Sequence, residues 1–133
     1  MPIELEMVLR LLLATILGAI IGYQRERARK PAGLRTHILI CVGAALFTIA
    51  SIYGFGTASD PARVAAGIVA GIGFIGAGAI LRAREEIIAG LTTAATIWAV
   101  ASIGLAAGAG LYLISVVATA ITLIVLFLPH PIR

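Results

Sequence analysis

The chain has 133 residues, of which 61% are hydrophobic and only 12% are charged. A soluble domain carries charge on roughly a quarter of its residues, so this sequence cannot cover a water-exposed surface and lipid must be part of its solvent. The formal net charge of +4 does not indicate a nucleic-acid-binding protein, because the basic residues are grouped like membrane topology signals.

Five stretches of the chain have the length and apolar character of a membrane-spanning helix. Such a helix needs about 20 residues to cross a hydrocarbon core of ~30 Å at 1.5 Å per residue. We therefore predict an all-α polytopic membrane protein, a single domain over residues 1–133 that forms a bundle of about five transmembrane helices. The predicted helices cover residues 5–23, 36–53, 62–81, 87–106 and 110–128.

The first predicted helix contains Gly18 and Gly22, a spacing that lets a second helix backbone approach closely. Glu4 and Glu6 precede its apolar run and a basic cluster follows it, the reverse of the charge order in a secretory signal peptide. We therefore interpret this segment as a spanning helix rather than a signal peptide.

Glu26 follows the first helix and is flanked by two arginines. Two interpretations stay open at this stage. The carboxylate is either a solvated loop charge or a partner of Arg35 or Arg82 near the inner surface.

Asp60 and Pro61 precede the third predicted helix and form a helix start, since an Asp side chain caps free N–H groups and Pro fits the first turn. Arg63 lies one turn from Asp60, so the pair is alternatively part of an outward-facing mouth.

Glycine is concentrated in the third predicted helix. Small residues at this spacing favour close helix packing in lipid, and we predict that this helix lies at the centre of the bundle. The alternatives are a dimer seam or a deformable helix that lines a pathway. The glycines are Gly67, Gly71, Gly73, Gly76 and Gly78.

The fourth predicted helix carries Thr92, Thr93 and Thr96, followed by Trp98. Threonine hydroxyls can bond back to carbonyls of their own helix, or Thr92 and Thr96 can bond to a neighbouring helix from a shared face. Trp98 is too deep for an interfacial belt, and we expect it to pack inside the bundle. We interpret the glycine-rich segment 104–110 as a tight turn, with a single bent helix as the alternative.

Basic residues predict the orientation. Eight of the ten lie in the first and third connections and at the C-terminus, whereas Arg10 and Arg63 lie on the other side. The positive-inside bias then places the N-terminus outside and the C-terminus in the cytoplasm. Opposite termini require an odd number of helices, in agreement with five.

The sequence contains no phosphate-binding loop, nucleophile elbow or zinc-protease motif. Cys41 stands alone and the two histidines are far apart, so no cofactor is evident, and Mg²⁺ has no ligand cluster to support it. No acidic residue lies in the middle of a predicted helix, which argues against a self-contained ion pump. We predict a protein that is not an enzyme.

Four motifs together resemble the MgtC/SapB family, from the first helix into the fifth. They read QRER at 24–27, KPAGLRTH at 30–37, DPARVAAGIVAGIGFIGAGAILR at 60–82 and GLTTAATIW at 90–98. The resemblance implies a bacterial inner-membrane protein of a virulence-associated family, linked to magnesium homeostasis, growth in low magnesium and survival in macrophages. It also implies a membrane-protein partner, because family members have been tied to restraint of the F-type ATP synthase.

Longer members of that family carry a cytoplasmic C-terminal domain, so the end at Arg133 predicts a short form with the transmembrane domain only. Virulence-type members often have Asn at the position of Thr92 and Cys at the position of Ala99, which puts the virulence-type role in doubt for this chain.

Two functions are compatible with these features. The first is a non-enzymatic regulator that docks against helices of another membrane complex, consistent with the glycine-rich helix and the missing catalytic groups. The second is a transporter or channel, for Mg²⁺ or another ion, that works as a homodimer or a higher homo-oligomer. Two hairpins that resemble each other, 18–36 and 76–93, favour the second, since transporters are often built from repeats.

Overall fold

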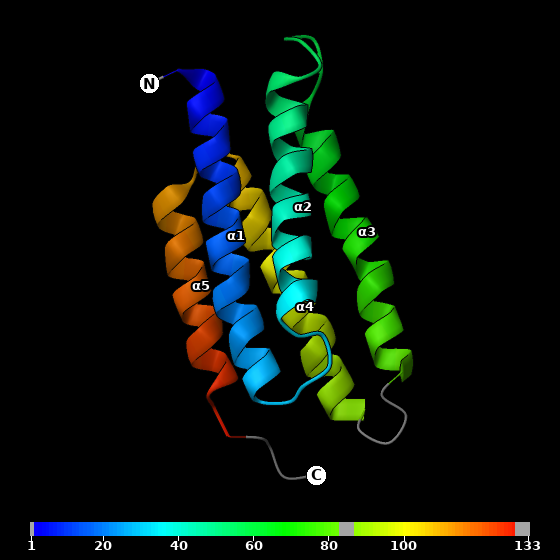
Figure 1. Cartoon of the computed structure of the whole chain (residues 1–133). Helices are drawn as coiled ribbons and strands as arrows, with labels where there is room; N and C mark the ends of the chain where they lie inside the picture. Colours follow the sequence, from blue (N-terminus) through cyan, green and yellow to red (C-terminus); the bar gives the residue numbers. More distant parts are fainter. Residues whose placement is uncertain (1, 83–86, 130–133) are drawn as a thin grey trace.

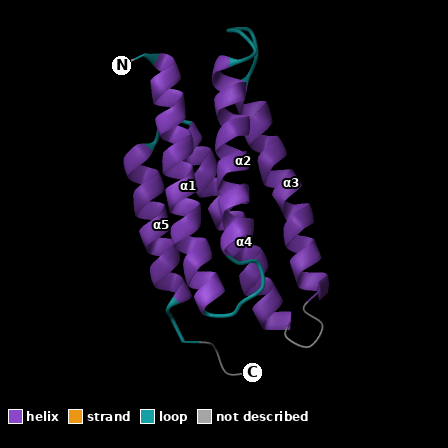
Figure 2. Ribbon diagram, viewed as in Figure 1, coloured by secondary structure: helices purple, strands orange, loops and turns teal. Residues whose placement is uncertain are grey.

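The computed structural model of the chain describes residues 2–82 and 87–129. Within these ranges it contains five helices and no strand (Figure 2), so the predicted all-α membrane bundle is confirmed. The helices are α1 (Ile3–Arg27), α2 (Leu34–Tyr53), α3 (Pro61–Arg82), α4 (Ile87–Gly108) and α5 (Tyr112–Leu126).

The first four helices are long and apolar enough to cross a membrane, and α5 is an apolar helix of only 15 residues. The start of α1 and the end of α5 lie at opposite ends of the bundle (Figure 1), as an odd number of alternating helices requires. Which end faces the cytoplasm stays a prediction. Arg84 and Arg133, two of the basic residues behind it, lie outside the described residues.

The centre of the bundle is α4, which contacts all four other helices. In Figure 1 it lies behind α1 and α2, while α3 and α5 occupy opposite flanks. The main core joins α1, α2 and α4 through small and branched apolar side chains, among them Ala14, Ile21, Ala45, Val100 and Ala107. The apolar surface that the bundle exposes is the surface that lipid covers.

The prediction that the third helix is central is wrong for the single chain. Helix α3 contacts only α2 and α4 among the described elements, and only Ile72 and Gly76 are buried along it. A glycine pattern shows that close approach is allowed, and it does not say which helix makes use of it. Four α3 glycines have open space where a side chain would lie: Gly67, Gly71, Gly73 and Gly78.

Close packing instead takes place on both sides of α2. A Cβ at Gly18 of α1 would lie 2.8 Å from the His37 carbonyl oxygen, and one at Gly22 would lie 2.9 Å from the Leu34 oxygen. On the other side, a Cβ at Gly104 of α4 would clash with the carbonyl oxygen of Cys41. Helix α2 is therefore held between two glycine-lined faces.

The segment 104–110 is only partly the predicted turn. Helix α4 continues to Gly108, and a Cβ at Gly108 would lie 2.6 Å from the Ala45 oxygen. The turn itself is formed by Gly110, whose φ of 87° lies in the left-handed region that glycine adopts without strain. Of Gly104, Gly108 and Gly110, only Gly110 serves to reverse the direction of the chain.

Candidate functional site

Two buried charged clusters lie at opposite ends of the bundle, and an apolar groove lies beside α3. The first cluster is at the end that carries the basic connection between α1 and α2. Arg25, in the last turn of α1, is only 2% exposed, and its Nη2 donates a hydrogen bond of 2.5 Å to the Thr93 hydroxyl of α4. A buried charge without a partner is costly in lipid. This hydrogen bond lowers that cost, and it joins α1 to α4.

His37 of α2 is fully buried near Arg25. Its Nδ1 lies 2.9 Å from the Gly33 carbonyl oxygen. Within the described part of the chain, neither His37 Nε2 nor Arg25 Nε has a hydrogen-bond partner. These two residues are thus buried polar groups with an unbonded nitrogen at this end, and they lie in two of the motifs that carry the family resemblance, QRER at 24–27 and KPAGLRTH at 30–37.

Replacing Thr93 with valine should destabilise the protein, because it removes the hydroxyl that accepts from the buried guanidinium. We expect a loss of about 1.5 kcal/mol in the free energy of unfolding, at the lower end of the range for hydrogen bonds to charged groups. Thr92→Val is the matched control, since the Thr92 hydroxyl makes no hydrogen bond to the described residues. Unfolding by denaturing detergent measures both; equal losses for the two variants would show that the Arg25 contact is unimportant.

Glu26 has a role that neither sequence interpretation included. Its Oε1 accepts a hydrogen bond of 3.0 Å from the backbone N–H of Leu34, the first residue of α2. The carboxylate is exposed and forms no ion pair with Arg35 or Arg82, both of which are described and exposed. The end of α1 therefore caps the start of α2 and fixes the connection between them.

This cap can be tested with two substitutions at one position. Glu26→Ala should lower the free energy of unfolding by about 1 kcal/mol, as is typical of a lost helix cap. Glu26→Gln keeps the acceptor oxygen and should stay close to the wild type. Thermal unfolding in one detergent gives the comparison, and a glutamine variant as unstable as the alanine variant would mean that the charge, not the acceptor, is what matters.

The second charged cluster surrounds Arg10, a basic residue inside the apolar run of α1. Arg10 is 6% exposed and pairs with Glu6 one turn earlier, at 2.6 Å. Its Nη1 donates to the Gly108 carbonyl oxygen at 3.0 Å, and its guanidinium lies 5.3 Å from the centre of the Tyr53 ring. One side chain thus joins the ends of α1, α2 and α4.

Asp60, one of the two residues that the sequence assigned to an outward-facing mouth, caps the start of α3. The Asp60 carboxylate accepts from the backbone N–H of Ala62 at 3.0 Å, as a cap. Asp60 and Arg63 are both exposed, and although both are described they form no ion pair with each other. Any functional role for the two side chains stays a prediction.

Among the α4 threonines, Thr93 rather than Thr92 or Thr96 bonds across to another helix. Thr96 donates to the carbonyl oxygen of Thr92 in its own helix, at 2.7 Å. The expectation for Trp98 is wrong, because this side chain is 54% exposed and borders a small hollow between α3 and α4. A residue deep in the sequence of a spanning helix can still face lipid.

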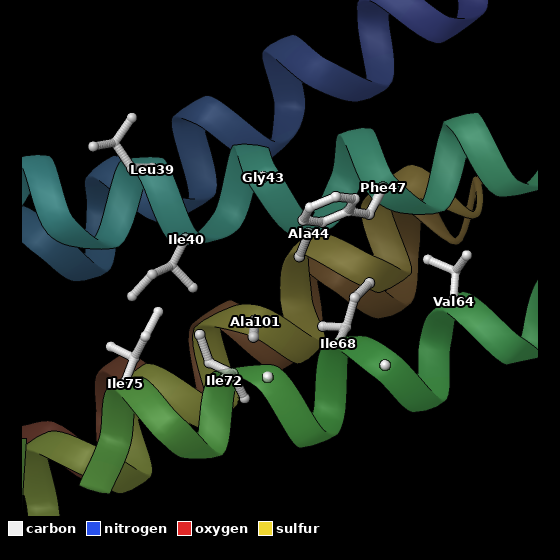
Figure 3. A pocket seen from close by; sticks show the side chains of 12 residues that line it. Leu39, Ile40, Gly43, Ala44, Phe47, Val64, Ile68, Ile72, Ile75 and Ala101 are labelled. Carbon is white, nitrogen blue, oxygen red and sulfur yellow. The ribbon is translucent and has the colours of Figure 1, made fainter. Parts of the chain in front are cut away.

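A groove of about 620 Å³ opens between α2 and α3, with Ala101 of α4 at its base. Figure 3 shows Ile40 and Ala44 of α2 on one side and Ile68 and Ile72 of α3 on the other. Every residue that lines the groove is apolar or glycine, including Gly43, Gly67 and Gly71. The groove therefore fits an apolar occupant that needs close backbone approach.

Within the described ranges, no group of three or more His, Cys, Asp or Glu side chains lies together in a way that could hold a metal ion. Sequence reasoning missed Arg10, Arg25 and His37 as buried groups. A signal existed for Arg10, because Glu6 stands one helical turn before it. The buried placement of Arg25 depends on which face of α1 meets α4, and the sequence does not specify that.

Comparison with known proteins gives consistent relatives. The chain is 48% identical to "Putative magnesium transporter YhiD" of Escherichia coli K12, over 94% of the chain and 61% of that protein. It is 45% identical to "Protein SapB" of Bacillus subtilis, over 83% and 50%, and 46% identical to "Protein MgtC" of Salmonella typhimurium LT2, over 87% and 49%.

The chain thus spans about half to three fifths of the length of these curated relatives. No solved structure matches it. The MgtC family matches residues 11–133, nearly the whole chain. With the expected motifs, the all-α membrane fold and these relatives in agreement, the chain belongs to the MgtC family.

Proposed function

We propose that this protein is a non-enzymatic regulator in the bacterial inner membrane that holds a helix of another membrane complex against the groove between α2 and α3. The observation that carries this proposal is the groove itself, which is apolar throughout and has three glycines in its walls. Small residues let a helix backbone approach closely, and van der Waals packing drives association in lipid.

The interior of the bundle favours docking over conduction. Its buried cations, Arg10 and Arg25, are at opposite ends, and each is bonded to a neighbouring helix. Between them the core is made of apolar side chains such as Leu17, Ile21 and Ile103. An ion that crossed this core would lose its hydration without finding a replacement ligand.

The partner that we propose is the membrane sector of the F-type ATP synthase, which would connect the protein to magnesium homeostasis and membrane energetics. This step follows from the family resemblance. In the proposed orientation the N-terminus is outside and the basic end of the bundle is cytoplasmic, in agreement with the positive-inside bias.

Proton pumping tests the proposal. In inverted membrane vesicles that contain ATP synthase, the wild-type protein should reduce ATP-driven proton uptake, and Gly71→Leu should relieve that inhibition by filling the groove. Gly73→Leu is the matched control, because Gly73 is on the same helix with equally open space but does not line the groove. Unchanged pumping with the wild-type protein, or equal effects of the two variants, would contradict this function.

The second candidate function is Mg²⁺ transport, because the Escherichia coli relative bears the name "Putative magnesium transporter YhiD". An ion pathway would then lie between copies of the chain, lined by the open glycines of α3. This alternative predicts a flux of Mg²⁺ by the purified protein, whereas a docking regulator has none.

A further inference from the structure

A second groove lies on the opposite flank, between α1 and α5, and it differs from the first in having a polar rim. Its volume is about 860 Å³, within the range of roughly 300–1,000 Å³ that is typical of ligand-binding clefts. Its apolar part is lined by Ile16, Ile20 and Leu123. Its polar rim, at the C-terminal end of α1, is formed by Gln24 and Arg27.

The length of this groove matches one leaflet of a bilayer. Ile16 and Arg27 are both on α1, and eleven residues of helix at 1.5 Å each span about 16 Å. This is about half of a ~30 Å hydrocarbon core. An acyl chain that lies along Ile16 and Ile20 would therefore bring its headgroup to the level of Arg27.

The rim offers complementary polar groups. The Arg27 guanidinium is held over the Tyr23 ring, 5.9 Å from its centre. A cation–π contact leaves the N–H groups of the guanidinium free to bond a phosphate. Arg27 forms no ion pair within the described ranges, and Glu26 beside it is already bonded to the Leu34 backbone.

The Gln24 side chain adds an acceptor to this rim. Its Oε1 is buried and has no hydrogen-bond partner among the described residues, a costly state for a polar atom. Since this oxygen is not exposed, the Gln24 amide must turn toward the groove to accept a hydrogen bond from a headgroup hydroxyl or ammonium. The rim thus pairs a phosphate-binding cation with an acceptor, at the mouth of an apolar channel.

We propose that the groove between α1 and α5 binds one anionic phospholipid, with an acyl chain along α1 and the phosphate on Arg27. Basic pockets between transmembrane helices are a known mode of anionic headgroup recognition. The groove between α2 and α3 lacks any such charged rim, which is why the two grooves have different occupants. This inference is independent of the proposed regulatory function.

Native mass spectrometry of the purified full chain tests this proposal. The protein is titrated with phosphatidylglycerol or phosphatidylcholine of the same acyl chains. We expect about fivefold tighter binding of phosphatidylglycerol, the effect of one basic residue near a membrane surface. Arg27→Gln should abolish the preference, and Arg35→Gln, which removes another exposed charge at the same end, should keep it. Ala19→Phe, which fills the groove, should weaken the binding of both lipids.

Three results would overturn the proposal. Equal affinity for the two lipids would mean that the rim does not recognise charge. Equal loss of the preference in Arg27→Gln and Arg35→Gln would assign it to the surface potential as a whole. Displacement of phosphatidylglycerol by an equal concentration of sn-glycerol 3-phosphate would show that the site binds free phosphate and makes no use of the acyl chain.

Discussion

Gly104→Ala is expected to be the most damaging single-methyl change in the described part of the chain. The added Cβ would meet the carbonyl oxygen of Cys41 and would lie 3.0 Å from the Ala44 side chain. Backbone atoms of α2 cannot move aside alone, so the whole helix must shift away from α4. Overpacking in a well-packed core costs roughly 1–3 kcal/mol or more, and a backbone clash belongs at the upper end. We expect a loss of about 3 kcal/mol in the free energy of unfolding.

The matched control is Gly71→Ala on α3, where no atom lies within 4 Å of the added methyl group. Alanine favours a helix over glycine by about 1 kcal/mol, so this variant should be as stable as the wild type or more stable. Both substitutions change one glycine of a Gly-x-x-x-Gly pair. Unfolding of the purified variants in mixed detergent micelles measures the difference. Equal stability of the two variants would contradict the placement of α4 at the centre of the bundle.

Arg10→Met should produce the next largest loss. It removes the ion pair with Glu6, the hydrogen bond to the Gly108 oxygen and the contact with the Tyr53 ring. Hydrogen bonds from charged groups contribute about 1.5–3 kcal/mol each in a buried site, although part of that is offset because methionine needs no desolvation. We expect a net loss of about 2 to 3 kcal/mol in the free energy of unfolding.

Arg63→Met is the control for charge, because Arg63 is the other basic residue outside the basic connections and it is exposed. A surface substitution of this kind is usually within about 0.5 kcal/mol. Thermal unfolding of both variants in the same detergent compares them. If Arg10→Met were as stable as Arg63→Met, the contacts of Arg10 would not hold the ends of the helices together.

The helices could be predicted from sequence because length and hydropathy are properties of each segment alone. Residues 36–53 were predicted for α2, for example, and the helix covers Leu34–Tyr53. The arrangement of the helices in space depends on which helix faces pack together, and the sequence alone does not specify those faces. Gly67 and Gly71 have the same spacing as Gly104 and Gly108, yet only the second pair is packed against another helix.

In the candidate site too, contacts between sequence neighbours could be predicted and contacts between distant residues could not. The cap formed by Asp60 was predictable because it involves neighbours in sequence. The contact between Arg25 and Thr93 joins residues 68 positions apart, and the bond from Leu34 to Glu26 requires the connection between α1 and α2 to fold back. Such contacts depend on tertiary packing, which a single sequence does not specify.

The two charged clusters hold α1, α2 and α4 together, while α3 has few buried residues. A helix with little buried surface separates from its neighbours more easily than the rest of the bundle. This difference suits a docking surface, because α3 can adjust to a partner helix without disturbing the contacts of Arg10 and Arg25.

Uptake of Mg²⁺ by proteoliposomes decides most directly between docking and transport. Purified protein is reconstituted over a fluorescent Mg²⁺ indicator, with protein-free liposomes and liposomes that hold an established Mg²⁺ channel as controls. A docking regulator with a sealed apolar core predicts uptake equal to that of protein-free liposomes. Uptake above that level that is abolished by Asp60→Asn, at the start of α3, would contradict it.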